Sequence, residues 1–159
     1  TEKDFISAIK SNFTQSALLM QSVIPLMKEK NFGRIINITS AMVKNPHLIM
    51  GLSTSARSGL HGLSKALSRE VAKFNITINN VLPERIDTDR QTQILNFQAK
   101  AADISYAEAR KELEENLTAK RMGTIEEFAG ICTFLCSEQA AYISGQNISV
   151  DGGNSTNFI

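Results

Sequence analysis

Cysteine and histidine are the side chains that most readily bind metals or form covalent links, and their spacing here favours neither chemistry. Cys132 and Cys136 stand four residues apart in an apolar helical stretch, and His47 and His61 are far from them in the sequence. A zinc site needs more ligands than this pair supplies. A disulfide across one helical turn has poor geometry because the two Cβ vectors run nearly parallel. We therefore expect two reduced core thiols and no metal site.

A glycine-rich turn that cradles phosphate would be a second kind of chemistry, and the sequence lacks it. The chain has nine glycines, and none forms a G-x-G-x-x-G pattern after a strand. Such turns let backbone N–H groups approach a pyrophosphate at a helix N-terminus. The 159 residues alone are therefore expected to bind a dinucleotide weakly or not at all.

The apolar pattern predicts helices that alternate with strands. We expect helices over residues 3–30, 53–74, 88–117 and 124–136, and strands over residues 34–38, 76–82 and 146–150. Pro25 should bend or loosen the first helix, and Thr124 with Glu127 forms a capping box. This alternation implies an α/β fold with a parallel sheet, of which only three strands are present.

Motifs in a fixed order resemble the C-terminal half of a short-chain dehydrogenase/reductase. They are GRIINITS, SARSGLHGLSKALSREVA, NNVLPERIDT and ISGQNISVDGG. The resemblance covers nearly the whole chain. It implies part of a doubly wound (Rossmann-like) parallel sheet, with the C-terminal strands and helices only. Residues 1–159 would then be the C-terminal portion of a single nucleotide-binding domain, with NAD or NADP as cofactor.

The resemblance also assigns an active-site tetrad, of which two members match. Family members use Asn, Ser, Tyr and Lys, and Asn12 and Ser40 fall where the first two are expected, at an interval of 40 − 12 = 28 residues. The Tyr and Lys positions are occupied by Ser53 and Arg57. Taken singly, a strand-end Ser is usually a cap and an Arg early in a helix is usually solvated.

The two departures change the chemistry at the predicted site. A serine hydroxyl is far less acidic than a phenol and shorter by a whole ring, so Ser53 should not reach an oxygen placed for Tyr. Arg57 is a permanent cation that can hold ribose hydroxyls or a phosphate but cannot pass a proton on. Ser40 and Arg57 together could still polarise a carbonyl.

A third departure follows the second predicted strand. Family members read Pro-Gly and then Ile-x-Thr there, where they contact the nicotinamide carboxamide. Pro83, Ile86 and Thr88 match, and Glu84 replaces the Gly. A side chain then stands where backbone would approach the cofactor, and a carboxylate there could favour an oxidised nicotinamide or block it.

The sequence is similar to a subgroup that resembles acyl-carrier-protein ketoacyl reductases but lacks the Tyr and Lys. Three hypotheses stay open. The first is an NAD(P)-linked oxidoreductase that transfers hydride on a carbonyl or alcohol substrate through an atypical site of Asn12, Ser40, Ser53 and Arg57. The second is an inactive relative that acts as a nucleotide-binding sensor or oligomeric scaffold. The third is a purely structural fragment. Tyr106 is a weak alternative source of a phenol, and Lys65 is too far from Arg57 to replace the missing Lys.

Charge and patterning restrict the expected partners. The chain has 17 Lys and Arg against 16 Asp and Glu, so its formal charge of +1 gives no broad attraction for nucleic acid or anionic lipid. No uninterrupted apolar run approaches about 18 residues. Reduced thiols and the absence of a signal-peptide pattern favour a cytoplasmic protein. Apolar residues on more than one helix face, such as Phe13 with Leu19 and Leu63 with Leu67, predict a homodimer or homotetramer, which the family resemblance also implies.

Overall fold

A three-stranded parallel sheet lies at the centre of the computed structural model, which describes residues 1–157. Its strands, in spatial order, are β1 (Gly33–Ile38), β2 (Ile76–Pro83) and β3 (Asn147–Val150). Gly33 pairs with Ile76 at one end of the sheet and Pro83 with Val150 at the other. The strands match the three β-branched runs to within a residue or two, so the predicted parallel α/β fold is confirmed.

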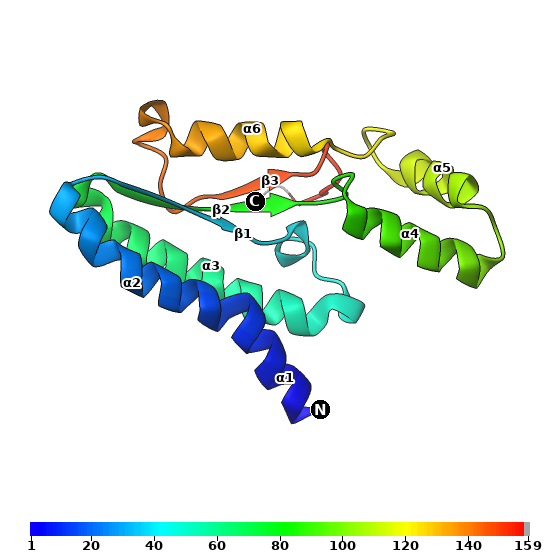
Figure 1. Cartoon of the computed structure of the whole chain (residues 1–159), viewed down its shortest axis with the longest axis horizontal. Helices are drawn as coiled ribbons and strands as arrows, with labels where there is room; N and C mark the ends of the chain where they lie inside the picture. The colour runs from blue at the N-terminus through cyan, green and yellow to red at the C-terminus, as the bar shows by residue number, and fades with distance from the viewer. Residues whose placement is uncertain (158–159) are drawn as a thin grey trace.

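Helices cover both faces of this sheet. The helices are α1 (Glu2–Ile9), α2 (Gln15–Lys30), α3 (Gly51–Val71), α4 (Asp89–Ala102), α5 (Tyr106–Asn116) and α6 (Ile125–Cys136). Figure 1 shows α2 and α3 on one face and α6 on the other, with α4 and α5 beyond the carboxyl ends of the strands. The carboxyl edge of the sheet therefore lies next to α4. Ligands of α/β sheets usually bind at this edge.

The predicted helix over residues 3–30 forms, but its irregularity lies elsewhere than expected. The α-helix changes to a π-helical segment, labelled η1, at Lys10–Thr14, whereas it stays α-helical through Pro25. Past Pro25 the helix stays regular to Lys30 and ends on Asn31, whose φ of 48° is left-handed. Single π turns inside α-helices occur frequently at functional sites, and this one contains Asn12.

The start of α6 follows the sequence prediction, whereas one of its cysteines does not. Thr124 Oγ1 accepts a hydrogen bond from the Glu127 N–H at 3.1 Å, and Glu127 Oε2 accepts one from the Thr124 N–H at 2.8 Å. Both thiols are free, but only Cys132 is partly buried. The prediction that Cys136 is a core residue was wrong, because the inward position at this end of α6 is taken by Leu135.

Three apolar clusters hold the layers together. One joins α2 and α3 to the sheet and includes Met20, Leu60 and Ile78. A second packs α6 against the opposite face of the sheet around Val81 and Leu135. The third lies between α4 and α5 and extends to Leu117 and Met122. The helical pair α4–α5 therefore has a core of its own beside the carboxyl edge of the sheet.

Asparagines in register across the three strands form a ladder that is buried at Asn37 and Asn80 and reaches the surface at Asn147. Asn37 pairs with Asn80, and Asn80 with Asn147. Asn37 Nδ2 donates to Asn80 Oδ1 at 3.2 Å and to Ser64 Oγ at 3.0 Å, and Asn80 Nδ2 donates to Asn147 Oδ1 at 2.7 Å. Because a slip by one residue would break these bonds, the ladder fixes the register of the sheet.

Asn80→Ala is expected to lower the free energy of unfolding by about 1–3 kcal/mol, because the buried amide of Asn37 loses a partner and the exposed Asn147 loses its link to β2. Urea unfolding of the longest gene product that contains this sequence would measure the effect. Asn96→Ala, on the exposed side of α4, removes an amide without breaking the ladder and should change stability by less than about 0.5 kcal/mol. Equal effects of the two changes would contradict the role given to the ladder.

Candidate active site

The carboxyl ends of β1 and β2 bring two of the predicted site segments together. Ser40 lies two residues after β1, and Pro83 ends β2. The Thr39 N–H donates to Val81 O at 2.9 Å, so the chain after β1 still runs beside β2. Ser40 and Pro83 thus lie at one edge of the sheet, as the sequence predicts.

Ser40 is a cap, and its geometry also leaves its proton available. It precedes a short 3-10 turn, Ala41–Val43, and its Oγ accepts a hydrogen bond from the Met42 N–H at 3.2 Å. The side chain is partly buried. A hydroxyl that accepts from backbone can still donate its own hydrogen, so Ser40 could polarise an oxygen placed at this edge.

Asn12 reaches the neighbourhood of the site through its π-helical segment, which packs on α3. Phe13 lies against Gly59 of α3, where an added Cβ would be 3.5 Å from the Phe13 ring. The Asn12 amide, however, is turned along its own helix, since Nδ2 donates to Ala8 O at 3.0 Å and to Ser11 Oγ at 2.9 Å. Only Oδ1 is left to accept a hydrogen bond from water or ligand.

Ser53 and Arg57 lie one turn apart on the first half of α3, which also contacts the 3-10 turn after Ser40. Their i, i+4 spacing places both on one face of the helix, and both are partly buried. Burial, and then repulsion from Arg90, lowers the pKa of Arg57 from its ordinary value. The segments of all four predicted residues therefore meet at α3, although no hydrogen bond within residues 1–157 joins two of the four side chains.

The alternative donors considered from the sequence lie away from this site. Lys65 Nζ donates to Gly145 O at 3.2 Å, which holds it at the far end of α3. Tyr106 packs against the α4–α5 cluster, and Tyr142 is fully exposed. Neither tyrosine occupies the position of the missing phenol.

The segment that follows β2 shows why Glu84 is tolerated in place of glycine. Within this segment the left-handed backbone conformation is at Arg85, with a φ of 50°, and not at Glu84. The Glu84 carboxylate accepts a hydrogen bond from Asn154 Nδ2 at 2.9 Å, near the C-terminal end of the described chain. The backbone at position 84 therefore does not need glycine, and the Glu84 carboxylate already has a hydrogen-bond partner in the protein.

Ile86 and Thr88 are held by backbone pairing and by a helix start. Ile86 forms a bridge to Gly123, and the Asp87 N–H donates to Gly123 O at 2.8 Å. A Cβ on residue 123 would lie 2.8 Å from Ile86 Cδ1, so a larger residue there would require the Ile86 side chain to move. Thr88 is the N-cap of α4, and its Oγ1 accepts from the Gln91 N–H at 3.4 Å.

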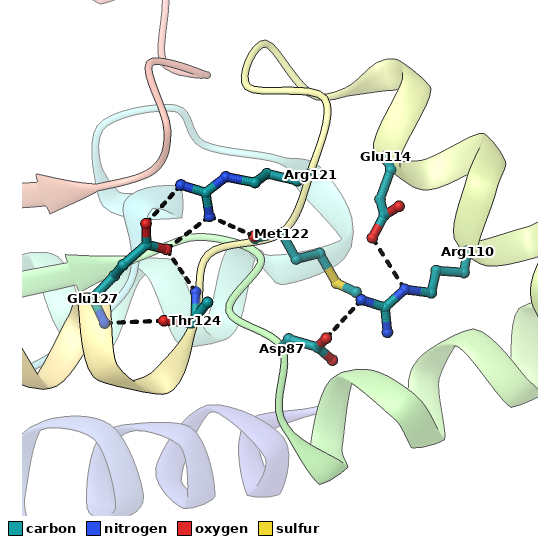
Figure 2. Close-up of polar contacts among 7 residues, drawn as sticks. All are labelled: Asp87, Arg110, Glu114, Arg121, Met122, Thr124 and Glu127. Carbon is teal, nitrogen blue, oxygen red and sulfur yellow. Dashed lines mark hydrogen bonds and ion pairs between the residues drawn. The ribbon is translucent and has the colours of Figure 1, made fainter.

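Two arginines form three ion pairs around this segment, and sequence reasoning missed both arginines (Figure 2). Arg110 Nη2 lies 2.6 Å from Asp87 Oδ2, and Arg110 Nε lies 3.0 Å from Glu114 Oε1. The hydrogen bond to Asp87 is the main cause that raises the pKa of Arg110. Arg121 binds Glu127 with both of its terminal nitrogens, and this pairing, together with the Thr124 N–H, lowers the pKa of Glu127 to about 2. The i, i+4 spacing of Arg110 and Glu114 was the only sequence signal.

His61 is a second residue that sequence reasoning left without a role. Its Nε2 lies 2.8 Å from Thr39 Oγ1, directly beside Ser40 in the chain, and the side chain is only 7% exposed. Burial lowers the pKa of His61 to about 4, with a smaller contribution from Lys44. His61 is therefore neutral at physiological pH and supports the edge of the site from within the core.

Two cavities near the sheet do not coincide with the predicted tetrad. A cavity of about 280 Å³ lies beside the segment after β2 and is lined in part by Glu84, Arg85 and Ile86. A groove of about 420 Å³ runs between α2 and β1, with Leu19 and Ile38 among its lining residues. No group of three or more His, Cys, Asp or Glu residues within 1–157 is placed to hold a metal ion.

The comparisons with known proteins settle the family. The family model described as "Enoyl-(Acyl carrier protein) reductase" matches residues 1–155. The chain belongs to the short-chain dehydrogenase/reductase family. The resemblance read from the motifs is thereby confirmed, including the relation to ketoacyl-acyl-carrier-protein reductases.

Individual relatives of this short-chain dehydrogenase/reductase are reductases. The NADPH-dependent reductase BacG of Bacillus subtilis (strain 168) is 37% identical over 153 residues, which cover 94% of this chain and 59% of that protein. The 3-oxoacyl-[acyl-carrier-protein] reductase MabA of Mycobacterium avium is 35% identical over 153 residues, covering 96% and 56% of the two chains. The chain therefore spans somewhat more than half the length of the curated relatives it matches.

Solved structures agree on the Rossmann-like fold. The crystal structure of YwfH, an NADPH-dependent reductase involved in bacilysin biosynthesis, superimposes with a TM-score of 0.91 at 32% identity, covering 99% of this chain and 60% of that one. L-sorbose reductase from Gluconobacter frateurii, solved with NADPH and L-sorbose, gives a TM-score of 0.91 at 25% identity with the same coverage. No helix within residues 1–157 is long and apolar enough to span a bilayer.

Proposed function

We propose that the full-length protein is an NAD(P)-linked oxidoreductase that interconverts a carbonyl group and an alcohol on a small molecule through an atypical site. The observation that carries the proposal is the placement of Ser40. It lies at the carboxyl edge of the sheet with its Oγ fixed by the Met42 N–H, and the 3-10 turn that it caps packs on the helix that carries Arg57. A hydroxyl donor with a nearby cation is suited to polarise a carbonyl oxygen.

The residues at this edge fit the nicotinamide end of a dinucleotide. Arg57 and Arg90 form no ion pair within the described residues, so two cations are available for an anionic ligand. Thr54 Oγ1 and Gln91 Nε2 are buried polar atoms that have no protein partner. Thr88 opens α4, whose free N–H groups favour phosphate oxygens. NAD or NADP would thus be held by Arg57, Pro83, Ile86 and Thr88.

A reduced nicotinamide, when bound, would supply the hydride for the substrate carbon. In our proposal the Ser40 hydroxyl donates a hydrogen bond to the substrate oxygen, and Arg57 stabilises the negative charge that develops there. Asn12 Oδ1 is the atom of that residue that remains able to hold a water. Ser53 lies one turn before Arg57, but its short hydroxyl reaches less far than a phenol, so protonation of the oxygen is the weak step of this site.

The second candidate function is that of an inactive relative which binds a nucleotide as a sensor or serves as an oligomeric scaffold. Ser53 and Arg57 favour it, because they stand at the two positions that move the proton in other family members. The two candidates differ in one observable. The sensor binds NAD(P) without turnover, whereas the enzyme binds it and consumes it.

The longest gene product that contains this sequence provides the test. Oxidation of NADPH and NADH is followed by absorbance with a panel of ketones and oxo acids. Ser40→Ala is expected to lower kcat/KM by about 10²–10³ because it removes the hydrogen-bond donor to the developing alkoxide. Ser55→Ala, an exposed hydroxyl on α3, is the matched control. Cofactor binding with no turnover of any substrate would favour the sensor.

We further propose a homodimer or homotetramer built on α1 to α3. Of the apolar residues named from the sequence, Phe13, Leu63 and Leu67 are partly buried against the core, whereas Leu19 of α2 is 64% exposed. Further exposed apolar side chains include Phe5 at 55% and Ile6 at 58% on α1, and contiguous apolar surface marks interfaces where it is large. A cytoplasmic location and the absence of nucleic-acid or membrane partners stay predictions.

Ile6→Lys is expected to shift the assembly towards monomers, since it places a charge in the proposed apolar contact. Sedimentation velocity at micromolar concentration measures the shift, and Lys3→Ala on the exposed surface of the same helix is the control. A wild-type protein that sediments as a single monomeric species would contradict the assembly.

A further inference from the structure

The segment from Pro83 to Thr88 is held by contacts with several different parts of the chain. Glu84 is tied to β3 and to Asn154, because its N–H donates to Val150 O at 3.1 Å and its carboxylate accepts from the Asn154 amide. Arg85 and Asp87 exchange backbone hydrogen bonds with Gly123. The Asp87 side chain reaches α5, through Arg110.

The backbone of this segment needs such support. Arg85 adopts a left-handed φ of 50°, which costs energy for a residue other than glycine. A single isolated bridge, Ile86 to Gly123, replaces the continuous ladder that holds β2 itself. The position of Thr88 at the start of α4 is therefore set by a short, strained link, and Asp87 is the residue directly before it.

Arg110 is well placed to fix that link because its own helix is firmly held. Ser105 and Glu108 form a capping box at the start of α5, and Ala109 packs into the apolar cluster shared with α4. Met122 belongs to the same cluster and precedes Gly123. The segment is thus supported from two directions, by the Arg110 guanidinium (Figure 2) and by the Gly123 backbone.

The guanidinium is also partly withdrawn from water. The side chains of Arg110 and Asp87 are 35% and 38% exposed, whereas those of Lys111 and Glu115, a helical pair one residue further on, are 78% and 67% exposed. The distance of 2.6 Å from Arg110 to Asp87 compares with 3.8 Å from Lys111 to Glu115. Short charge-assisted hydrogen bonds, such as the one from Arg110 to Asp87, are stronger than long ones.

From this geometry we propose that Arg110 is a positioning residue that acts through Asp87 on the cofactor-binding segment Ile86–Thr88, so that its removal weakens nicotinamide-cofactor binding. The proposal rests on the function proposed above. It couples the packing of α4–α5 to cofactor affinity without any contact between Arg110 and the cofactor.

The experiment uses the longest gene product that contains this sequence. Arg110→Gln and Asp87→Asn are each expected to raise the Kd of NADPH, measured by calorimetry, by about threefold to fivefold, the upper range for a partly exposed ion pair. The double variant should show the same increase as either single variant, since both remove one contact. Steady-state kinetics should show a higher KM for the cofactor with kcat nearly unchanged.

Matched controls separate positioning from plain stability. Glu114→Gln removes the other, intrahelical partner of Arg110, and Lys111→Gln removes a charge from the same helix. Both should leave the Kd of NADPH within about twofold, the scale of a surface pair. Arg110→Lys keeps the charge but not the fork and should recover part of the affinity. If Glu114→Gln and Lys111→Gln raise the Kd as much as Arg110→Gln, Arg110 is only a helix stabiliser and the proposal is overturned.

Hydrogen exchange of the backbone amides over residues 84–88 tests the same contact without any cofactor. Faster exchange in Arg110→Gln than in Lys111→Gln supports the positioning role, and equal exchange overturns it. A wild-type protein that binds neither NADPH nor NADH would contradict the proposed function, whereas the exchange measurement would still decide whether Arg110 fixes the segment.

Discussion

Ser53→Tyr combined with Arg57→Lys is expected to raise turnover of a generic ketone by the full-length protein, by up to about 10²–10⁴, the contribution of a positioned general acid. The structure places both positions one turn apart on the same face of α3, next to the segment that carries Ser40. A phenol at position 53 gains the length that serine lacks, and a lysine at position 57 can lower the pKa of that phenol. Steady-state kinetics at saturating NADPH measure the change.

The single variants sharpen this prediction. Ser53→Tyr alone should help less than the double change. The Arg57 guanidinium is bulkier than a lysine ammonium, and because it is permanently charged it cannot pass a proton on. Ser55→Tyr places the same phenol on an exposed position of α3 and is the control. If the wild type already reduces ketones at ordinary rates and the double change abolishes activity, Ser53 and Arg57 form a working site of their own.

The strands could be predicted because their residues carry the signal locally. β2 is a short buried run of β-branched and apolar residues bounded by Asn75 and Pro83, and such runs pair in parallel when helices separate them. The position of Ser40 followed in the same way, since it depends only on where β1 ends. The π-helical segment around Asn12 could not be predicted, because α and π turns differ only in which carbonyl is reached, and packing of Phe13 on Gly59 helps to decide that.

The departures at the site required contacts between residues that are distant in the sequence. The sequence left open whether Glu84 would face the cofactor, and its carboxylate is bound by Asn154, which is 70 residues further along the chain. The contact of Asp87 with Arg110 spans 23 residues and two helices. Neither pairing has a periodic signature. The first depends on the path of the chain after β3, and the second on where α5 packs.

The His61 side chain is expected to make stability depend on pH in a window set by its own titration. The pKa of His61 is lowered from 6.5 to about 4, so the unfolded chain takes up this proton before the folded chain does. Stability from neutral His61 is fully present above about pH 6.5 and is lost as the pH falls to about 4. The shift corresponds to about 3 kcal/mol at most, since one pKa unit is worth about 1.4 kcal/mol.

The physical cause is that a charged imidazole would be buried beside the Thr39 hydroxyl, with the positive charge of Lys44 nearby. Urea unfolding at several pH values measures the loss of stability. Carboxyl groups also titrate in this range, and comparison with His61→Gln cancels their contribution to the pH dependence. That variant keeps a polar side chain near Thr39 without a titrating ring, so its free energy of unfolding should fall less over this window. His47→Gln, at an exposed position, should follow the wild type. A wild-type curve parallel to that of His61→Gln, or an NMR titration of His61 centred near 6.5, would show that the ring is not held neutral by burial.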